Sequence, residues 1–358
     1  MSIERKKTRR VNVGNIAIGG DSKIAIQSMT NVPTNDYDAV YAQISSLQKN
    51  GCDIVRLTVP DMESVKSIYK LKSSDINITL VADIHFDYRI AIECANAGID
   101  KIRINPGNIG DADRVKAVVD ACRSKNIPIR IGVNSGSLEK NILAKHGSPT
   151  AAALCESAMF HASLLEKFDF NDIVISVKSS NALNMIEANR LLSEKCNYPL
   201  HLGVTEAGRG ASANIKSAIG IGTLLSEGIG DTVRVSLTGD PVEEIYAARS
   251  ILNALNIGDD KYYDIVSCPT CGRTKINLIS ICEMVEKKLN SLPKPSRKIT
   301  IAVMGCVVNG PGEAAEADIG IAGGNGEAVL FKNGKMIKKI KEENVVDELV
   351  SQVLLLDV

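Results

Sequence analysis

The stretch that decides the fold runs Ile78-Thr-Leu-Val-Ala-Asp-Ile-His-Phe-Asp-Tyr-Arg-Ile-Ala-Ile-Glu-Cys-Ala-Asn-Ala-Gly-Ile-Asp-Lys-Ile-Arg-Ile-Asn105. Two short runs rich in β-branched residues, 78–83 and 101–105, flank a helix-like segment at 89–97. A strand, a helix and a second strand in this order predict a parallel βαβ unit.

The same unit recurs along the first 250 residues. The strand-like runs are 24–29, 54–58, 78–83, 101–105, 128–132, 173–178, 200–205 and 232–236. Eight such runs separated by helical segments predict an α/β fold, a (β/α)8 TIM-type barrel. A doubly wound parallel sheet is the alternative. It would more often carry an early glycine-rich dinucleotide fingerprint, whereas Gly220-Ile-Gly222 comes late and lacks the third glycine.

The chain is expected to divide into residues 1–260, the barrel, and 261–358, a small α+β domain. Segment 261–264 is interpreted as the boundary. The second part shows a helix-like segment at 276–290, strand-like runs at 298–303 and 318–322, and a terminal helix. Lys332-Asn-Gly334 predicts a hairpin, because Asn-Gly favours a tight turn between strands.

Composition excludes several classes of protein. Lys plus Arg and Asp plus Glu number 42 each, which argues against a nucleic-acid binder driven by bulk charge. No apolar run reaches the roughly 18 residues of a membrane helix. Segment 1–10 is basic and lacks the apolar stretch of a signal peptide, so it is interpreted as a solvated arm. Nine cysteines without an export signal predict a reducing, cytoplasmic location.

Two turn-rich stretches near the end of the chain carry thiols: Cys268-Pro-Thr-Cys271-Gly-Arg-Thr274 and Met304-Gly-Cys306-Val-Val-Asn-Gly-Pro-Gly-Glu313. Three thiols and a carboxylate could hold an iron–sulfur cluster or another metal. Cys-Pro-x-Cys-Gly is also typical of a zinc knuckle, but the second stretch has one cysteine only, and a closed zinc site needs a second pair. Three thiols and a carboxylate therefore favour an iron–sulfur cluster with one unusual iron position over zinc. The alternative is that these cysteines are free thiols on turns and bind no metal.

Polar residues gather where the predicted barrel strands end, which is where barrel active sites form. They are Arg56, Asp83, Arg103, Asn105, Arg130, Asn134, Lys178, Glu206, Arg234 and Ser236. Four arginines and a lysine at one mouth predict an anion site, most simply for a diphosphate, because guanidinium groups bind phosphate oxygens in pairs. Taken singly, each could instead form a structural ion pair. Glu206 precedes the flexible Ala207-Gly208 and looks free to act as an acid, whereas His85 is interpreted as structural.

These stretches resemble the bacterial 4-hydroxy-3-methylbut-2-en-1-yl diphosphate synthase family of the non-mevalonate isoprenoid pathway, essentially from end to end. The matching stretches are Gln27-Ser-Met-Thr30, Val81-Ala-Asp-Ile-His-Phe86, Lys101-Ile-Arg-Ile-Asn-Pro-Gly107, Arg130-Ile-Gly-Val-Asn134, Thr205-Glu-Ala-Gly208 and both thiol motifs. The two thiol motifs are highly specific as a pair.

The resemblance implies a reaction, a cofactor and partners. The reaction would be the two-electron reductive ring opening and dehydration of 2-C-methyl-D-erythritol 2,4-cyclodiphosphate to 4-hydroxy-3-methylbut-2-enyl diphosphate. A [4Fe–4S] cluster would be held by Cys268, Cys271, Cys306 and Glu313, and Glu313 could leave its iron during turnover. Glu206 would donate the proton, flavodoxin or ferredoxin would supply electrons, and two chains would form a head-to-tail homodimer.

Two other functions remain open on the residues alone. The first is a zinc-ribbon protein that uses its barrel for binding and carries no redox chemistry. The second is a barrel enzyme with cobalamin or a radical cofactor, although the usual radical motif Cys-x3-Cys-x2-Cys is absent.

Overall fold

The computed structural model describes residues 3–258, 261–308, 312 and 315–357. The chain forms two compact units, Met1–Gly258 and Asp259–Val358, and each is described by itself. Within the described residues, no helix combines the length and the apolar character that crossing a membrane requires.

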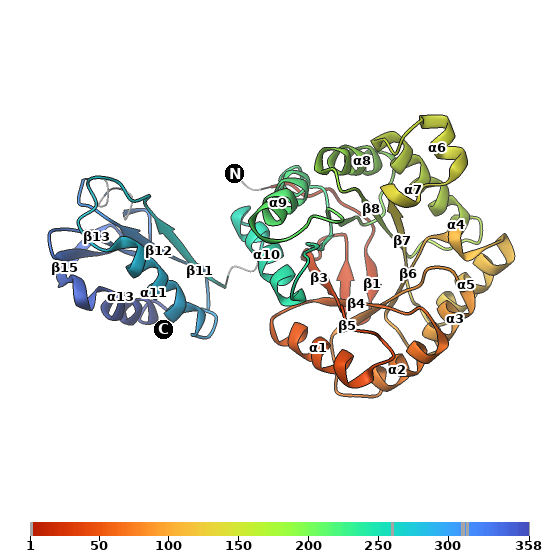
Figure 1. The fold of residues 1–358 in the computed structure, drawn as a ribbon, viewed down its shortest axis with the longest axis horizontal. Coiled ribbons are helices and arrows are strands. Elements are labelled where there is room, and N and C mark those ends of the chain that lie inside the picture. Colours follow the sequence, from red (N-terminus) through yellow and green to blue (C-terminus); the bar gives the residue numbers. More distant parts are fainter. Residues whose placement is uncertain (1–2, 259–260, 309–311, 313–314, 358) are drawn as a thin grey trace. The chain divides into compact units, whose positions relative to one another are not determined.

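The first unit is a parallel barrel with its helices outside (Figure 1). Its strands are β3 (Ala25–Met29), β4 (Ile54–Thr58), β5 (Thr79–Asp83), β6 (Lys101–Ile104), β7 (Ile129–Asn134), β8 (Ile173–Lys178), β9 (His201–Leu202) and β10 (Thr232–Val233). They pair in the order β8-β7-β6-β5-β4-β3-β10-β9. A parallel bridge between Ile175 and Leu200 joins the two end strands, so the expected barrel is confirmed.

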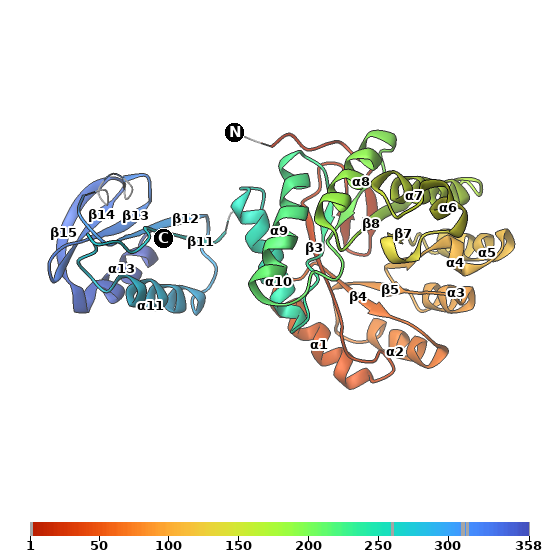
Figure 2. The ribbon, with the colours of Figure 1, turned by 45° about the horizontal axis from the view of Figure 1, so that its top comes forward.

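Helices follow the strands and cover the barrel wall, as the turned view in Figure 2 also shows. They are α1 (Tyr37–Lys49), α2 (Met62–Lys72), α3 (Tyr88–Asn96), α4 (Pro106–Ile109), α5 (Ala112–Ser124), α6 (Lys140–His146), α7 (Ala151–Glu166), α8 (Ala182–Lys195), α9 (Gly210–Ser226) and α10 (Pro241–Ala254). Most begin at an Asp or Asn whose side chain accepts a backbone N–H, as Asp61 does from Ser64 at 2.8 Å. Thr150 caps α7 and accepts the N–H of Ala153 at 3.2 Å.

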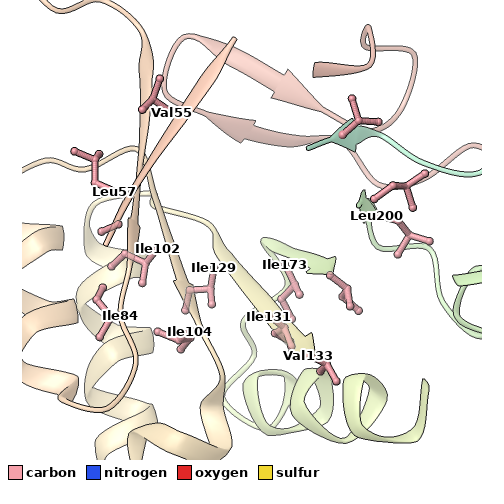
Figure 3. Close-up of a cluster of buried hydrophobic side chains, with 14 of the residues drawn as sticks. Val55, Leu57, Ile84, Ile102, Ile104, Ile129, Ile131, Val133, Ile173 and Leu200 are labelled. Atoms are coloured by element: carbon pink, nitrogen blue, oxygen red, sulfur yellow. The ribbon is translucent and has the colours of Figure 1, made fainter. Parts of the chain in front are cut away.

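The main core lies between the strands and the helices. Isoleucine, valine and leucine side chains from neighbouring strands meet there, among them Ile102, Ile129 and Ile131, which are fully buried (Figure 3). Strands in a barrel are covered on both faces, so their outward residues are apolar and their inward residues fill the interior. Alternation along each strand then fixes which side chains face inward.

A short hairpin closes the end of the barrel at which the strands begin. It consists of β1 (Val11–Val13) and β2 (Ile16–Ile18), which pair antiparallel. Val11, Val13 and Ile18 are buried in one cluster with residues near the starts of the strands, such as Ile54 on β4. This apolar floor leaves the opposite end, where the strands finish, as the barrel's open mouth.

The basic N-terminal segment is bound to the barrel, so its interpretation as a solvated arm is wrong. Arg5 pairs with buried Asp231 at 3.2 Å, and Lys6 Nζ donates to the carbonyl of Cys196 at 2.8 Å. The guanidinium of Arg9 stacks over the ring of Tyr198. These partners lie near the ends of elements that are far away in the sequence, which is why the segment's composition could not reveal them.

In its described residues the second unit has a five-stranded sheet and the helices α11 and α13. Its elements are β11 (Tyr263–Ser267), α11 (Leu278–Asn290), β12 (Ile299–Met304), β13 (Ile319–Gly323), β14 (Glu327–Lys332), β15 (Lys335–Lys341) and α13 (Val345–Leu354). The strands follow one another in order; β11, β12 and β13 are parallel, and the β14–β15 hairpin turns at Asn333-Gly334, both with positive φ. The expected hairpin and helices are confirmed. Of segment 261–264, which was interpreted as the boundary, Tyr263 and Asp264 already belong to the edge strand β11, and the two units meet after Gly258.

Candidate active site

The barrel mouth contains a polar pocket of about 210 Å³. Its lining consists of Met29, Arg56, Thr58, Asp83, His85, Arg103, Arg130, Asn134, Ser176, Lys178, Thr205 and Arg234. Most of these residues lie in the later part of a strand or just beyond its carboxyl end, whereas Arg130 is the second residue of β7. Those that share a strand are two or four positions apart, the spacing of side chains that point to the same face. The structure therefore gathers four arginines and one lysine in one small space.

Asp83 neutralises two of these cations. Its carboxylate accepts from Arg103 Nη1 at 2.9 Å and lies 3.5 Å from Arg56 Nε. The strand register makes this possible, because β5 lies between the strands that carry the two arginines. Burial raises the pKa of Asp83, but the charges of Arg56 and Arg103 outweigh it and lower the pKa to about 2. Asp83 is thus ionised at neutral pH, and its carboxylate orders two guanidinium groups.

Arg234 has a separate carboxylate partner. Arg234 Nη2 lies 3.1 Å from an oxygen of Glu244, a buried residue on α10. The sequence did not single out Glu244. An acidic residue in the first turn of a helix is usually a solvated group that complements the helix dipole, and only the packing of α10 against β3 turns this one inward.

Arg130 and Lys178 lack a carboxylate partner among the described residues. Arg130 Nη1 donates to Ser176 Oγ at 3.3 Å, while its Nε and Nη2, and the Nζ of Lys178, are buried without a hydrogen-bond acceptor. Burial, followed by the charges of Arg234 and Arg56, lowers the pKa of Lys178 well below its ordinary value. Buried cations without acceptors are costly, and an anion in the pocket would supply what they lack.

Three predicted residues do not line this pocket. Asn105 is buried and caps α4, where its side chain accepts the N–H of Gly107 at 3.0 Å. Ser236 is half-buried in the loop after β10. Glu206 is exposed in the turn between β9 and α9, with a φ of +52° that non-glycine residues adopt rarely.

Five residues that line the pocket were not among the predicted binding residues: Met29, Thr58, His85, Ser176 and Thr205. Strand alternation could have found most of them, since Thr58 lies two positions after Arg56, and His85 two positions after Asp83. Unlike the arginines and the lysine, these side chains carry no fixed charge, so their burial in a strand does not by itself indicate a binding site.

The second unit brings two of the three predicted thiols to one edge. Cys268 directly follows β11 and Cys306 comes two residues after β12, and these strands pair in parallel with Ser267 opposite Val303. The N–H of Gly305 donates to the Sγ of Cys268 at 3.2 Å, which joins the two loops. Cys271 is exposed on the turn between them, where hydrogen bonds from the Arg273 backbone and side chain lower the pKa of its thiol.

Glu313, the predicted fourth ligand, lies outside the described residues. Within the described part of the chain, no three His, Cys, Asp or Glu side chains are close enough together to hold a metal ion. The donor chemistry nevertheless fits an iron–sulfur cluster: thiolates are its usual ligands, and an N–H that donates to a ligand sulfur is a contact that tunes such clusters. Cys52, Cys94 and Cys122 differ, because they are buried in the barrel core.

Two family models match the chain: the GcpE TIM-barrel domain over residues 8–249 and the GcpE protein C-terminal domain over residues 264–354. The chain belongs to the GcpE family. This confirms the resemblance found in the sequence, and with it an enzyme of isoprenoid biosynthesis.

Curated relatives in the GcpE family match over nearly the whole chain. A protein of Clostridium perfringens is 60% identical over 97% of this chain and 98% of its own length. One of Ruminiclostridium cellulolyticum is 56% identical, with 98% of both chains covered. Both are named 4-hydroxy-3-methylbut-2-en-1-yl diphosphate synthase (flavodoxin).

Solved structures resemble the barrel of this GcpE chain in fold alone. A 3-dehydroquinate dehydratase from Geobacillus kaustophilus has a TM-score of 0.51 at 16% identity and covers 69% of this chain and 96% of its own. A dihydropteroate synthase from Stenotrophomonas maltophilia has a TM-score of 0.50 at 14% identity and covers 70% of this chain and 98% of its own.

Proposed function

We propose that this enzyme opens the ring of 2-C-methyl-D-erythritol 2,4-cyclodiphosphate and removes water, giving 4-hydroxy-3-methylbut-2-enyl diphosphate. The reaction consumes two electrons and two protons. The names of its close relatives in the GcpE family support this choice. The observation that carries it is the pair of buried cations without carboxylates, Arg130 and Lys178, in a pocket where Asp83 and Glu244 already neutralise the others.

Substrate binding follows from this distribution of charge. A cyclic diphosphate carries two negative charges, and its oxygens would accept from the buried N–H groups of Arg130 and Lys178 that have no acceptor among the described residues. The negative charge would also oppose the burial and the neighbouring cations that lower the pKa of Lys178. Arg56, Arg103 and Arg234 are held in place by their carboxylates and can add bidentate contacts to phosphate oxygens. In this proposal Asn134 lies at the rim of the pocket, while Asn105 and Ser236 support the loops around it.

The second unit is proposed to hold a [4Fe–4S] cluster through Cys268, Cys271, Cys306 and Glu313, where the cluster would supply the two electrons one at a time. Flavodoxin, which the relatives' names mention, is the proposed donor, with ferredoxin as the alternative. We further propose a head-to-tail homodimer in which the second unit of one chain serves the barrel of the other, and a cytoplasmic location.

Glu206 is the proposed proton donor for the departing hydroxyl group. It follows Thr205, which lines the pocket, and it is exposed at the same end of the barrel. Its positive φ is a conformation that costs on the order of 1 kcal/mol or more and is common at functional sites. That strain supports a role for Glu206 beyond filling a turn.

Anaerobic purification followed by iron, sulfide and zinc analysis tests the proposal first. We expect about four irons and four sulfides per chain, which is the stoichiometry of such a cluster. We also expect the enzyme to convert the cyclic diphosphate when reduced flavodoxin is supplied. One zinc without iron after anaerobic reconstitution would instead favour a zinc-ribbon protein that binds ligands in its barrel.

A further inference from the structure

Glu244 uses both of its carboxylate oxygens inside the barrel wall. One oxygen accepts from Arg234 Nη2 at 3.1 Å and from the N–H of Leu237 at 3.1 Å. The other accepts from the hydroxyl of Ser28 on β3 at 2.8 Å and lies 3.4 Å from Arg234 Nε. The side chain of Glu244 is only 4% exposed, so water does not compete for these bonds.

These contacts tie three elements together. Glu244 belongs to α10, Ser28 to β3, and Arg234 and Leu237 to the segment that leaves β10. The two carboxylate oxygens contact one edge of the guanidinium, through Nε and Nη2, so rotation of Arg234 away from the pocket would break both contacts. The bond to the N–H of Leu237 holds the backbone directly after Ser236.

We propose that Glu244 is a positioning residue that aims Arg234, and the loop through Ser236, at the diphosphate of the substrate. This inference rests on the proposed function. Glu244 does not line the pocket and acts through Arg234. A charged side chain that is already ordered in the ligand-free enzyme raises the affinity for the substrate, because binding then loses less conformational entropy.

Electrostatics alone would give the opposite result, which makes the test decisive. Replacing Glu244 by Gln removes a negative charge beside the anion site, and charge by itself would tighten anion binding. Loss of the carboxylate contacts to Nε and Nη2 would free the Arg234 side chain to move and would weaken anion binding. The sign of the change in affinity therefore separates a positioning role from simple neutralisation.

The experiment measures inorganic pyrophosphate binding by calorimetry on the full-length enzyme. Glu244→Gln should bind about tenfold more weakly than wild type, by about 1.4 kcal/mol, and the KM for the cyclic diphosphate should rise. Glu243→Gln is the matched control, because Glu243 precedes Glu244 on the same helix and is exposed. It removes the same charge and should leave the affinity unchanged.

A double-mutant cycle shows whether Glu244 acts through Arg234. In an Arg234→Met background, Glu244→Gln should have little further effect on affinity, and full additivity would overturn the proposal. Unchanged or tighter pyrophosphate binding by Glu244→Gln would overturn it too. If Glu244→Gln does not fold, Glu244→Asp, which keeps the charge but shortens the reach, should show the same loss. A wild-type enzyme that binds no pyrophosphate would instead overturn the proposed function, and the role of Glu244 with it.

Discussion

Gly132 on β7 leaves open the space that the guanidinium of Arg103 occupies. A Cβ added at Gly132 would lie 2.2 Å from Arg103 Nε, far inside contact distance. Arg103 Nη2 also donates to the carbonyl of Gly132 at 3.3 Å. The missing side chain on β7 thus leaves room for the guanidinium of Arg103, on the neighbouring strand β6, which also donates to Asp83.

Gly132→Ala should therefore push Arg103 out of place while the backbone stays tolerant, since Gly132 has no positive φ. Overpacking of this kind costs about 1–3 kcal/mol in the free energy of unfolding. We also expect pyrophosphate affinity to fall about tenfold, because the ion pair with Asp83 holds Arg103 toward the pocket. Urea unfolding and calorimetry measure the two effects. Gly136→Ala is the control, because no atom of the described residues lies within 4 Å of its added Cβ. Equal losses in both variants would contradict the prediction.

Lys178→Met should separate stability from binding. Lys178 is buried, and no described residue accepts a hydrogen bond from its amine, so an apolar side chain of similar length should raise the free energy of unfolding of the ligand-free enzyme by about 1 kcal/mol. Pyrophosphate binding should weaken about 100-fold, as expected when a buried charge that contacts an anion is lost. Lys125→Met, on an exposed residue after α5, should change neither quantity. Destabilisation together with normal binding in Lys178→Met would contradict both expectations.

Ionised Asp83 should make the free energy of unfolding of the barrel fall as the pH is lowered. Its folded-state pKa of about 2 lies below the ordinary value of 3.8, so it contributes stability above that ordinary value and loses it as the pH falls toward 2. The contribution at neutral pH is about 2 kcal/mol by linkage. Asp83→Asn should lose more, about 3–5 kcal/mol, because Arg56 and Arg103 stay buried without a carboxylate.

Urea unfolding between about pH 6 and pH 3 measures this dependence, with the ordinary carboxylate range as its guide. The difference between wild type and Asp83→Asn should shrink as the pH falls. Asp53→Asn serves as the comparison, because the Asp53 side chain is more exposed than that of Asp83 and its partner Lys23 is exposed. A difference that stays constant over the whole range would show that Asp83 does not titrate below its ordinary pKa.

Cys306→Ala should abolish the iron content of anaerobically purified enzyme and leave the barrel folded. Cys306 is half-buried on the loop that follows β12, in the second unit, so its loss does not touch the barrel core. Cys196→Ala is the control: Cys196 is also half-buried, but its Sγ bonds the carbonyl of Leu192 within the barrel unit. Full iron content in Cys306→Ala would show that the ligand assignment is wrong.

Local patterns were sufficient for most of the fold. The eight barrel strands follow from β-branched runs between polar turns, and the Asn333-Gly334 hairpin follows from turn chemistry. The elements that were missed give weak local signals: β1 and β2 have three residues each, and β11 is a half-exposed edge strand paired only with β12. Each of them is stabilised by partners that its own residues do not specify.

The sequence by itself determined the barrel, the cations at its strand ends and the paired thiol motifs, because strand alternation and motif spacing are properties of neighbouring residues. Tertiary structure alone decided how the charges are distributed. Asp83 could have served any cation at the mouth, and Glu244 could have faced water. Strand register places Arg56 and Arg103 beside Asp83, so that both pair with its carboxylate. Helix packing places Glu244 beside Arg234. Among the described residues Arg130 and Lys178 are left without a carboxylate, which is the basis of the proposed anion site. A buried charge needs a partner nearby in space, and the fold sets that distance.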